Sequence, residues 1–248
     1  AWVNLGAVLE MTLYNGKMKA FGDEQIGPKT GDPREFKSFE EFWNAYCKQQ
    51  EYILKHTFIQ QCVVDKLRAR YLAAPMTSAL HDLCMENCKD LHSGDIEGGI
   101  KLGFYDMLGY GTVVDSVVAV KNLVFDEKKV SMSELLDALE SNFEGKEVIR
   151  QYCINAPKYG NNDPYADKIG KDIEAEAIKY SKKYRAAFGA ELDVRYVPVT
   201  AHIPLGKVVG ATPNGRKAGP PLADGGGPSH GADTNGPTCT LISVANTK

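Results

Sequence analysis

The sequence lacks three features that would place it in a specialised class. Its apolar segments are too short to span a bilayer, and Asp115 interrupts the segment 111–120. It has no strong excess of either charge, because 29 Lys and Arg face 32 Asp and Glu. Its six cysteines include no C-x-x-C pair. We therefore expect no membrane association, no nucleic-acid partner and no disulfide framework, and we predict a cytoplasmic, reduced protein.

The most metal-like pattern combines two histidines and two cysteines at helical spacing: His81, Cys84, Cys88 and His92. On one helix these side chains would extend over three turns, about 16 Å, which a single ion cannot span. Cys84 and Cys88 also flank the apolar positions of the segment, as core cysteines do. We therefore predict no metal site in this chain.

The composition is typical of a globular α/β protein, with 43% hydrophobic and 25% charged residues, and 248 residues fit a single domain. Apolar positions at helical period, with capping residues and prolines at segment starts, predict that residues 1–190 are mostly helical. The expected helices cover residues 5–13, 38–71, 75–92, 112–125, 131–143, 146–155 and 163–188, and residues 94–111 are expected to form a glycine-rich loop.

Residues 191–248 are expected to be rich in strands and loops. Alternating β-branched and aromatic residues predict strands at 193–203, 207–211 and 238–244. Pro198 and Pro204 would interrupt a central ladder, so the first of these strands is expected to be bulged. Residues 212–237 form a long loop rich in glycine and proline, and loops of that length are usually functional or disordered.

This loop carries the longest of several motifs that resemble signatures of the glycyl radical enzymes, the pyruvate formate-lyase-like family. The motifs occur in order along essentially the whole chain: residues 25–30 (QIGPKT), 115–116 with 119–121, 155–163 (NAPKYGNND), 210–225 (GATPNGRKAGPPLADG) and 229–238 (SHGADTNGPT). Because several separate motifs occur in the family's order, the resemblance is specific.

The resemblance implies an α/β fold, part of a ten-stranded barrel surrounded by helices. It also implies radical chemistry: an S-adenosylmethionine-dependent activating enzyme makes a glycyl radical, which generates a cysteine thiyl that takes hydrogen from the substrate. The family's Cys-x-Glu loop would lie shortly before Ala1, and its Arg-Val-x-Gly-Tyr radical motif after Lys248. We therefore assign no catalytic residue and no bound cofactor to this chain, and expect an internal piece of one domain, 1–248, that is inactive alone.

The resemblance further implies four substrate-binding residues. Trp2 lies about where relatives place an aromatic residue that contacts the substrate. Tyr196, Pro198 and Ala201 lie on the segment that lines the pocket in relatives. A purely structural packing role would also explain Trp2, and both interpretations stay open.

For the parent enzyme, the motif around Pro221–Gly225 resembles the dehydratase, choline-lyase and decarboxylase branch of the family. The favoured function is a lyase that cleaves a carbon–heteroatom bond, as a glycerol or diol dehydratase does. The alternatives are a 4-hydroxyphenylacetate-type arylacetate decarboxylase, a formate acetyltransferase, or a non-catalytic scaffold. The expected partners are a small-molecule substrate, the activating enzyme and a second copy of the chain in a homodimer.

Overall fold

The computed structural model describes residues 1–22, 24–99 and 102–247. Its regular elements are β1 Trp2–Asn4, α1 Leu5–Leu13, η1 Lys19–Phe21, η2 Pro33–Glu35, α2 Phe39–Tyr71, α3 Pro75–Ala79, α4 Asp82–Asn87, η3 Leu91–Ser93, β2 Leu102–Leu108, α5 Tyr110–Val120, the π-helical turn η4 Lys121–Asp126, α6 Met132–Glu140, α7 Glu147–Asn155, α8 Pro164–Lys183, η5 Ala187–Gly189, β3 Glu191–Arg195, α9 His202–Lys207 and α10 Pro237–Thr247.

The three strands form one parallel sheet in the order β1-β2-β3. Asp106 on the central strand stands opposite both Trp2 on β1 and Arg195 on β3. Parallel strands require crossover connections, and here helices make them, since α2 lies between β1 and β2 and α5 to α8 lie between β2 and β3. The register therefore gathers residues from three distant parts of the sequence at one point of the sheet.

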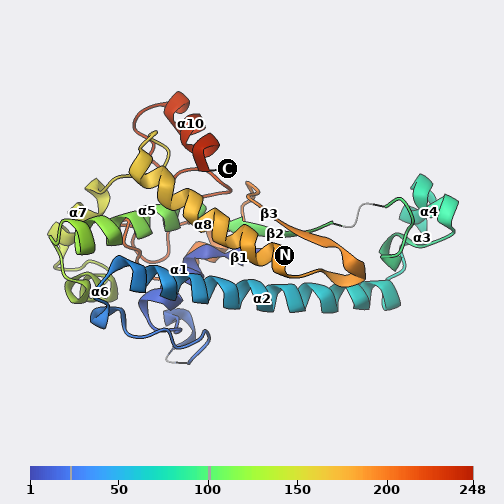
Figure 1. The fold of residues 1–248 in the computed structure, drawn as a ribbon, viewed down its shortest axis with the longest axis horizontal. Coiled ribbons are helices and arrows are strands. Elements are labelled where there is room, and N and C mark those ends of the chain that lie inside the picture. Colours follow the sequence, from blue (N-terminus) through green and yellow to red (C-terminus); the bar gives the residue numbers. More distant parts are fainter. Residues whose placement is uncertain (23, 100–101, 248) are drawn as a thin grey trace.

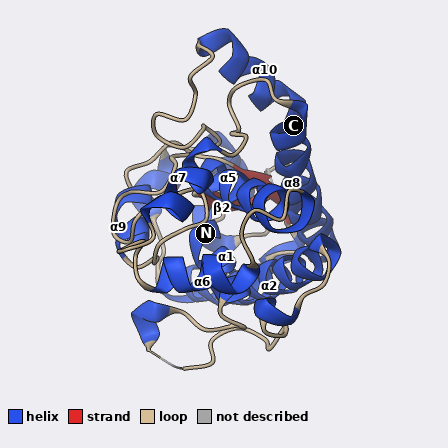
Figure 2. Ribbon diagram, turned by 90° about the vertical axis from the view of Figure 1, so that its left-hand side faces the viewer, coloured by secondary structure: helices blue, strands red, loops and turns tan. Residues whose placement is uncertain are grey.

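Helices cover this small sheet on both sides, as Figures 1 and 2 show. The long helix α2 runs below the sheet in Figure 1 and α8 crosses above it, while α3 and α4 project at the far end of α2. The chain thus forms a parallel sheet enclosed by helices, in agreement with the expected α/β class.

Helix starts agree closely with the sequence signals. The Ser131 hydroxyl accepts the Glu134 N–H while the Glu134 carboxylate accepts the Ser131 N–H, which is the expected capping box of α6. Ser38 caps α2 by accepting the Glu41 N–H. Asp163 caps α8, with Pro164 in the first turn. Local sequence therefore determines where these helices begin.

The strand predictions were largely wrong. The expected strand 193–203 is β3 only as far as Arg195; the chain then loses regular structure, and α9 begins at His202. Residues 207–211 form no strand. The expected strand 238–244 is instead helix α10, which Pro237 opens and which packs on α8, with the buried Thr247 next to Gly170. Strand propensity depends on context, and here packing against a helix overrides it.

Two further expectations were wrong. The segment 75–92 is not one helix: α3 ends at Ala79, α4 ends at Asn87, and Cys88 adopts the left-handed conformation with φ 51°. The expected glycine-rich loop contains β2, whose sequence LGFYDML lacks a clean alternation. Residues 100 and 101 of that expected loop lie outside the described residues.

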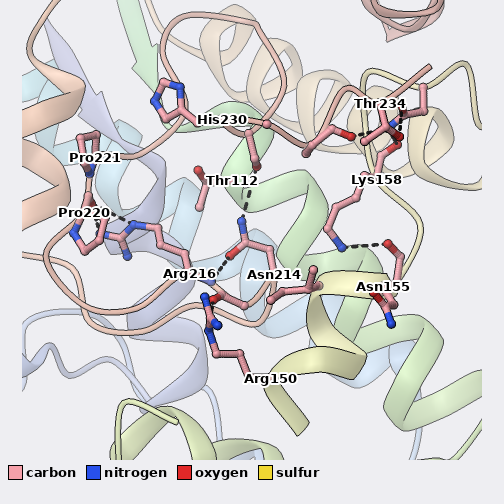
Figure 3. Close-up of a pocket in the computed structure, with 17 residues that line it drawn as sticks. Thr112, Arg150, Asn155, Lys158, Asn214, Arg216, Pro220, Pro221, His230 and Thr234 are labelled. Atoms are coloured by element: carbon pink, nitrogen blue, oxygen red, sulfur yellow. Dashed lines mark hydrogen bonds between the residues drawn. The ribbon is translucent and has the colours of Figure 1, made fainter. Parts of the chain in front are cut away.

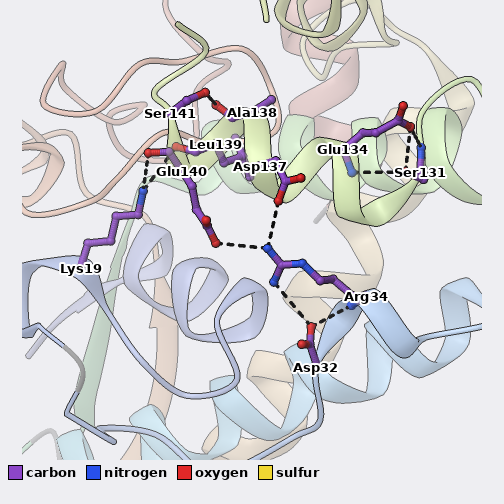
Figure 4. Close-up of polar contacts among 10 residues, drawn as sticks. All are labelled: Lys19, Asp32, Arg34, Ser131, Glu134, Asp137, Ala138, Leu139, Glu140 and Ser141. Carbon is purple, nitrogen blue, oxygen red and sulfur yellow. Dashed lines mark hydrogen bonds and ion pairs between the residues drawn. The ribbon is translucent and has the colours of Figure 1, made fainter.

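Polar contacts fix the irregular segment 17–37 to α6 (Figure 4). The Arg34 guanidinium lies 3.2 Å from Asp137 and 3.3 Å from Glu140, and Asp32 is nearby. The Lys19 ammonium donates to the Leu139 and Glu140 carbonyls, which belong to the last turn of α6. These exposed contacts position the segment but contribute little stability individually.

Every residue of α5 is buried, including Asp115, Ser116 and Thr112. The neighbours of a helix that is buried on all sides must approach it closely. The loop of residues 212–237, the motif loop, approaches α5 in this way at Gly111. A Cβ added there would lie 2.4 Å from the Gly227 carbonyl oxygen and 2.8 Å from the Ser229 nitrogen. In the part of the chain that the structure describes, no helix is long and apolar enough to cross a bilayer.

We predict that Gly111→Ala destabilises the protein by about 1–3 kcal/mol, because the added methyl group meets backbone that cannot move aside independently. In an open helix the same change would be stabilising. Gly210→Ala is the matched control, since its Cβ would approach nothing closer than 3.4 Å. Chemical denaturation measures both variants, and a Gly111→Ala protein as stable as the control would contradict the predicted close approach.

Candidate functional site

Arg216 organises the motif loop. Its guanidinium donates to four backbone carbonyls, those of Gly206, Val209, Gly210 and Pro220, at 2.6–3.5 Å. Burial lowers the pKa of Arg216 to about 10, although the nearby Glu10 carboxylate opposes this. Glu10 is itself buried and accepts the N–H groups of Lys19 and Gly210. Each guanidinium nitrogen donates to a backbone carbonyl, either at Pro220 within the loop or in the segment 206–210 before it, so Arg216 is a structural residue.

Asp115 ties the same loop to the core. Its fully buried carboxylate accepts the Tyr159 N–H at 2.8 Å and the Ser229 hydroxyl. Burial raises the pKa of Asp115 to about 6, while the Lys158 ammonium and the two hydrogen bonds act in the opposite direction. One side chain thus joins α5, the 155–163 motif and the 229–238 motif.

A cavity of about 750 Å³ lies between these motifs (Figure 3). Arg216 and His230 approach it from one side, Lys158 and Asn155 from the other, and Arg150 lies between them. The lining residues contain three cationic side chains and no carboxylate: Thr112, Arg150, Ile154, Asn155, Ala156, Lys158, Asn161, Asn214, Gly215, Arg216, Pro220, Pro221, Ser229, His230, Gly231, Ala232 and Thr234. The cavity is therefore basic.

A second hollow, of about 470 Å³, lies at the register point of the sheet and includes Trp2, Phe104, Asp106 and Arg195. The Arg195 Nε donates to the Asp106 carboxylate, and the guanidinium lies 4.0 Å from the centre of the Phe104 ring. Arg195 is nevertheless about half exposed. Arg68, Asp65 and Gln61 of α2 complete the polar wall.

The structure brings only one of the predicted substrate residues into this hollow. Trp2 lines it with 61% of its surface exposed. Tyr196 packs with its ring centre 4.7 Å from that of Tyr110, Pro198 is exposed, and Ala201 is buried next to α9. None of these three lines either cavity. Their role in substrate binding stays a prediction.

Arg195 and Asp106 were not predicted from the sequence as site residues. A charged residue directly before Tyr196, in a segment already expected to line the pocket, was the available signal for Arg195. No local signal was available for Asp106, because the strand that carries it was not predicted. Within the described residues, no group of three or more His, Cys, Asp or Glu side chains is placed to hold a metal ion.

Fold and site together define the class. A parallel sheet enclosed by helices places the chain among the α/β proteins, and its register presents polar side chains at one hollow. A family model described as "Pyruvate formate lyase-like" matches residues 1–206. The chain belongs to this family, that of the glycyl radical enzymes.

The relatives agree with this assignment. The chain is 56% identical over 248 residues to isethionate sulfite-lyase of Nitratidesulfovibrio vulgaris, matching all of this chain and 30% of that protein. The solved hydroxyproline dehydratase of Clostridioides difficile superimposes with a TM-score of 0.94 at 38% identity, covering 100% of this chain and 31% of that one. The glycerol dehydratase of Clostridium butyricum gives 0.91 at 36%, covering 98% and 30%.

The expectation of a glycyl radical enzyme fold is therefore confirmed, and the three-stranded sheet is part of that barrel. The chain spans about 30% of the length of the curated relatives that it matches.

We predict that the stability contributed by Asp115 decreases as the pH rises from about 4 to about 6. The folded pKa of about 6 exceeds the ordinary value of 3.8, so the folded state binds more protons in this window. The difference corresponds to about 3 kcal/mol at most. Asp115→Asn should remove this pH dependence, as measured by denaturation at several pH values.

The control for this experiment is Asp233→Asn, which changes an exposed carboxylate in the loop that Asp115 contacts through Ser229. It should retain the wild-type pH profile. Identical profiles for Asp115→Asn and wild type would show that Asp115 does not titrate in this window.

Proposed function

We propose that the whole protein is a glycyl radical lyase that cleaves the carbon–sulfur bond of a small hydroxyalkyl sulfonate of the isethionate type. The observation that carries this proposal is the geometry of Arg195 in the hollow beside Trp2. The 56% identity to an isethionate sulfite-lyase, against 38% to the hydroxyproline dehydratase, supports the choice of reaction.

Arg195 is oriented for binding an oxyanion. Asp106 accepts its Nε–H and the Phe104 ring covers one face, so the side chain is fixed before a ligand arrives. No described residue accepts a hydrogen bond from the two terminal nitrogens of the Arg195 guanidinium, so both are available to a ligand. A planar guanidinium binds tetrahedral oxyanions through two parallel hydrogen bonds, which suits a sulfonate.

The lining side chains carry balanced formal charges, since Arg68 and Arg195 stand against Asp65 and Asp106. Asp106 is nearly buried and paired with Arg195, and Asp65 accepts the Gln61 amide, whereas no described residue accepts a hydrogen bond from the Arg68 guanidinium, which leaves this cation open to an anionic substrate. Trp2 and Phe104 supply apolar surface next to these charges, as a short carbon chain bearing a sulfonate requires.

The radical chemistry follows from family membership as a proposal for the whole protein. A glycyl radical, installed by an S-adenosylmethionine-dependent activating enzyme, would supply the hydrogen abstraction. The residues described here would bind and orient the substrate, with Trp2, Tyr196, Pro198 and Ala201 retained as proposed contacts. A homodimer in the cytoplasm is the proposed state.

The second candidate is dehydration of a neutral diol, which the likeness to glycerol dehydratase favours. Assays of the activated full-length protein with isethionate, glycerol and 1,2-propanediol distinguish the two. Release of sulfite from isethionate supports the proposal. Turnover of the diols without turnover of isethionate would replace it with the dehydratase.

We predict that Arg195→Gln in the activated full-length protein raises KM for isethionate roughly 10- to 100-fold, because a charge-assisted pair contributes about 1.5–3 kcal/mol. Arg195→Lys should retain part of this affinity, since it keeps the charge and loses the planar geometry. Arg70→Gln, at the exposed end of α2, is the matched control. Unchanged KM in Arg195→Gln would exclude Arg195 as the sulfonate anchor.

We predict that Trp2→Ala weakens substrate affinity by more than it lowers stability, since the ring is exposed to the hollow and not buried in the core. Substrate titration and thermal unfolding of the same full-length variant measure the two effects. Trp2→Phe should retain most of the affinity. A loss of stability as large as the loss of affinity would indicate a packing role.

A further inference from the structure

We propose that the basic cavity between the motifs is a second site, which binds a small molecule through a tetrahedral oxyanion such as a phosphate, sulfate or sulfonate group. It shares no lining residue with the hollow around Arg195. The proposal rests on Arg150 and Lys158 and does not depend on the reaction proposed above.

The Arg150 guanidinium has N–H donors that no described residue uses. Its Nε donates to the Gly215 carbonyl at 3.0 Å, and no described residue accepts a hydrogen bond from its two terminal nitrogens. The single backbone bond fixes the guanidinium at the cavity wall beside Asn214, as Figure 3 shows. The side chain is half-buried, so its charge is poorly screened and an anion in the cavity would be attracted strongly.

Lys158 supplies the second charge from the opposite side. Its ammonium donates to the Cys153 and Ala156 carbonyls, each at 2.8 Å, and has three N–H donors in all. Burial lowers the pKa of Lys158, and the Asp115 carboxylate opposes this effect. The buried Asp115 is engaged by Ser229 and Tyr159, so it does not occupy the cavity itself.

The remaining wall suits an oxyanion. The buried carboxylates of Asp115, near Lys158, and of Glu10, near Arg216, do not line the cavity. The described lining side chains add amides and hydroxyls and no carboxylate. Arg216 contributes positive potential to the cavity, although its guanidinium already donates to backbone carbonyls such as those of Gly206 and Gly210. A volume of about 750 Å³ admits a phosphate-bearing small molecule as well as the bare ion.

The test uses the full-length protein without activation and inorganic phosphate and inorganic sulfate as separate probes, titrated calorimetrically at constant ionic strength. Wild type should show saturable binding of at least one of the two ions. Arg150→Gln and Lys158→Gln should each weaken it roughly 10- to 100-fold, since each removes a charge-assisted interaction. Arg150→Lys, which keeps the charge, should lose less and serves if the glutamine variant does not fold.

Two variants show where the ion binds. Arg70→Gln, a matched change on an exposed surface, should leave phosphate affinity unchanged. Arg195→Gln should also leave it unchanged, which separates this site from the proposed substrate hollow. The proposal is overturned if neither ion binds saturably, if Arg150→Gln binds as wild type does, or if Arg195→Gln abolishes binding.

Discussion

The buried carboxylate of Asp115 is the constraint on which the arrangement of the motifs depends. Three motifs that are far apart in the sequence meet at this group through the Tyr159 N–H and the Ser229 hydroxyl. A buried carboxylate requires such donors, because leaving it unpaired would cost several kcal/mol. The resulting close approach explains why Gly111 has no room for a side chain. Loop position, cavity shape and helix packing therefore follow from satisfying one charge.

The sequence predicted the parts of the fold that local chemistry determines. The Ser38, Ser131 and Asp163 caps are encoded within a few residues, and the structure confirms the helix start at each of them. Helix ends were less predictable: α8 ends at Lys183 because Tyr184 adopts an extended backbone, and no glycine or proline stands at this point to signal the end. Such ends depend on packing partners that are distant in sequence.

The strands and the site could not be read from local pattern. β1 has only three residues, β2 lacks a clean alternation, and the two strands are defined by pairing with one another and with β3. The hollow at their register point, including Asp106 and Arg195, was therefore not visible before the pairing was known. α10 shows the opposite error, because its β-branched residues suggest a strand while contact with α8 favours a helix. The family motifs gave the class without giving these contacts.

The roles of three arginines can be distinguished by how far the protein already satisfies their donors. Arg216 gives all its nitrogens to backbone carbonyls and holds a loop. Arg195 gives only Nε, to a carboxylate that also orients it. Arg150 gives only Nε, to a neutral carbonyl, and so keeps its full charge facing the cavity. An arginine has five N–H donors in fixed geometry, so each donor left over is aimed in a defined direction. The structural arginine and the two arginines proposed to bind ligands thus differ in their unused donors.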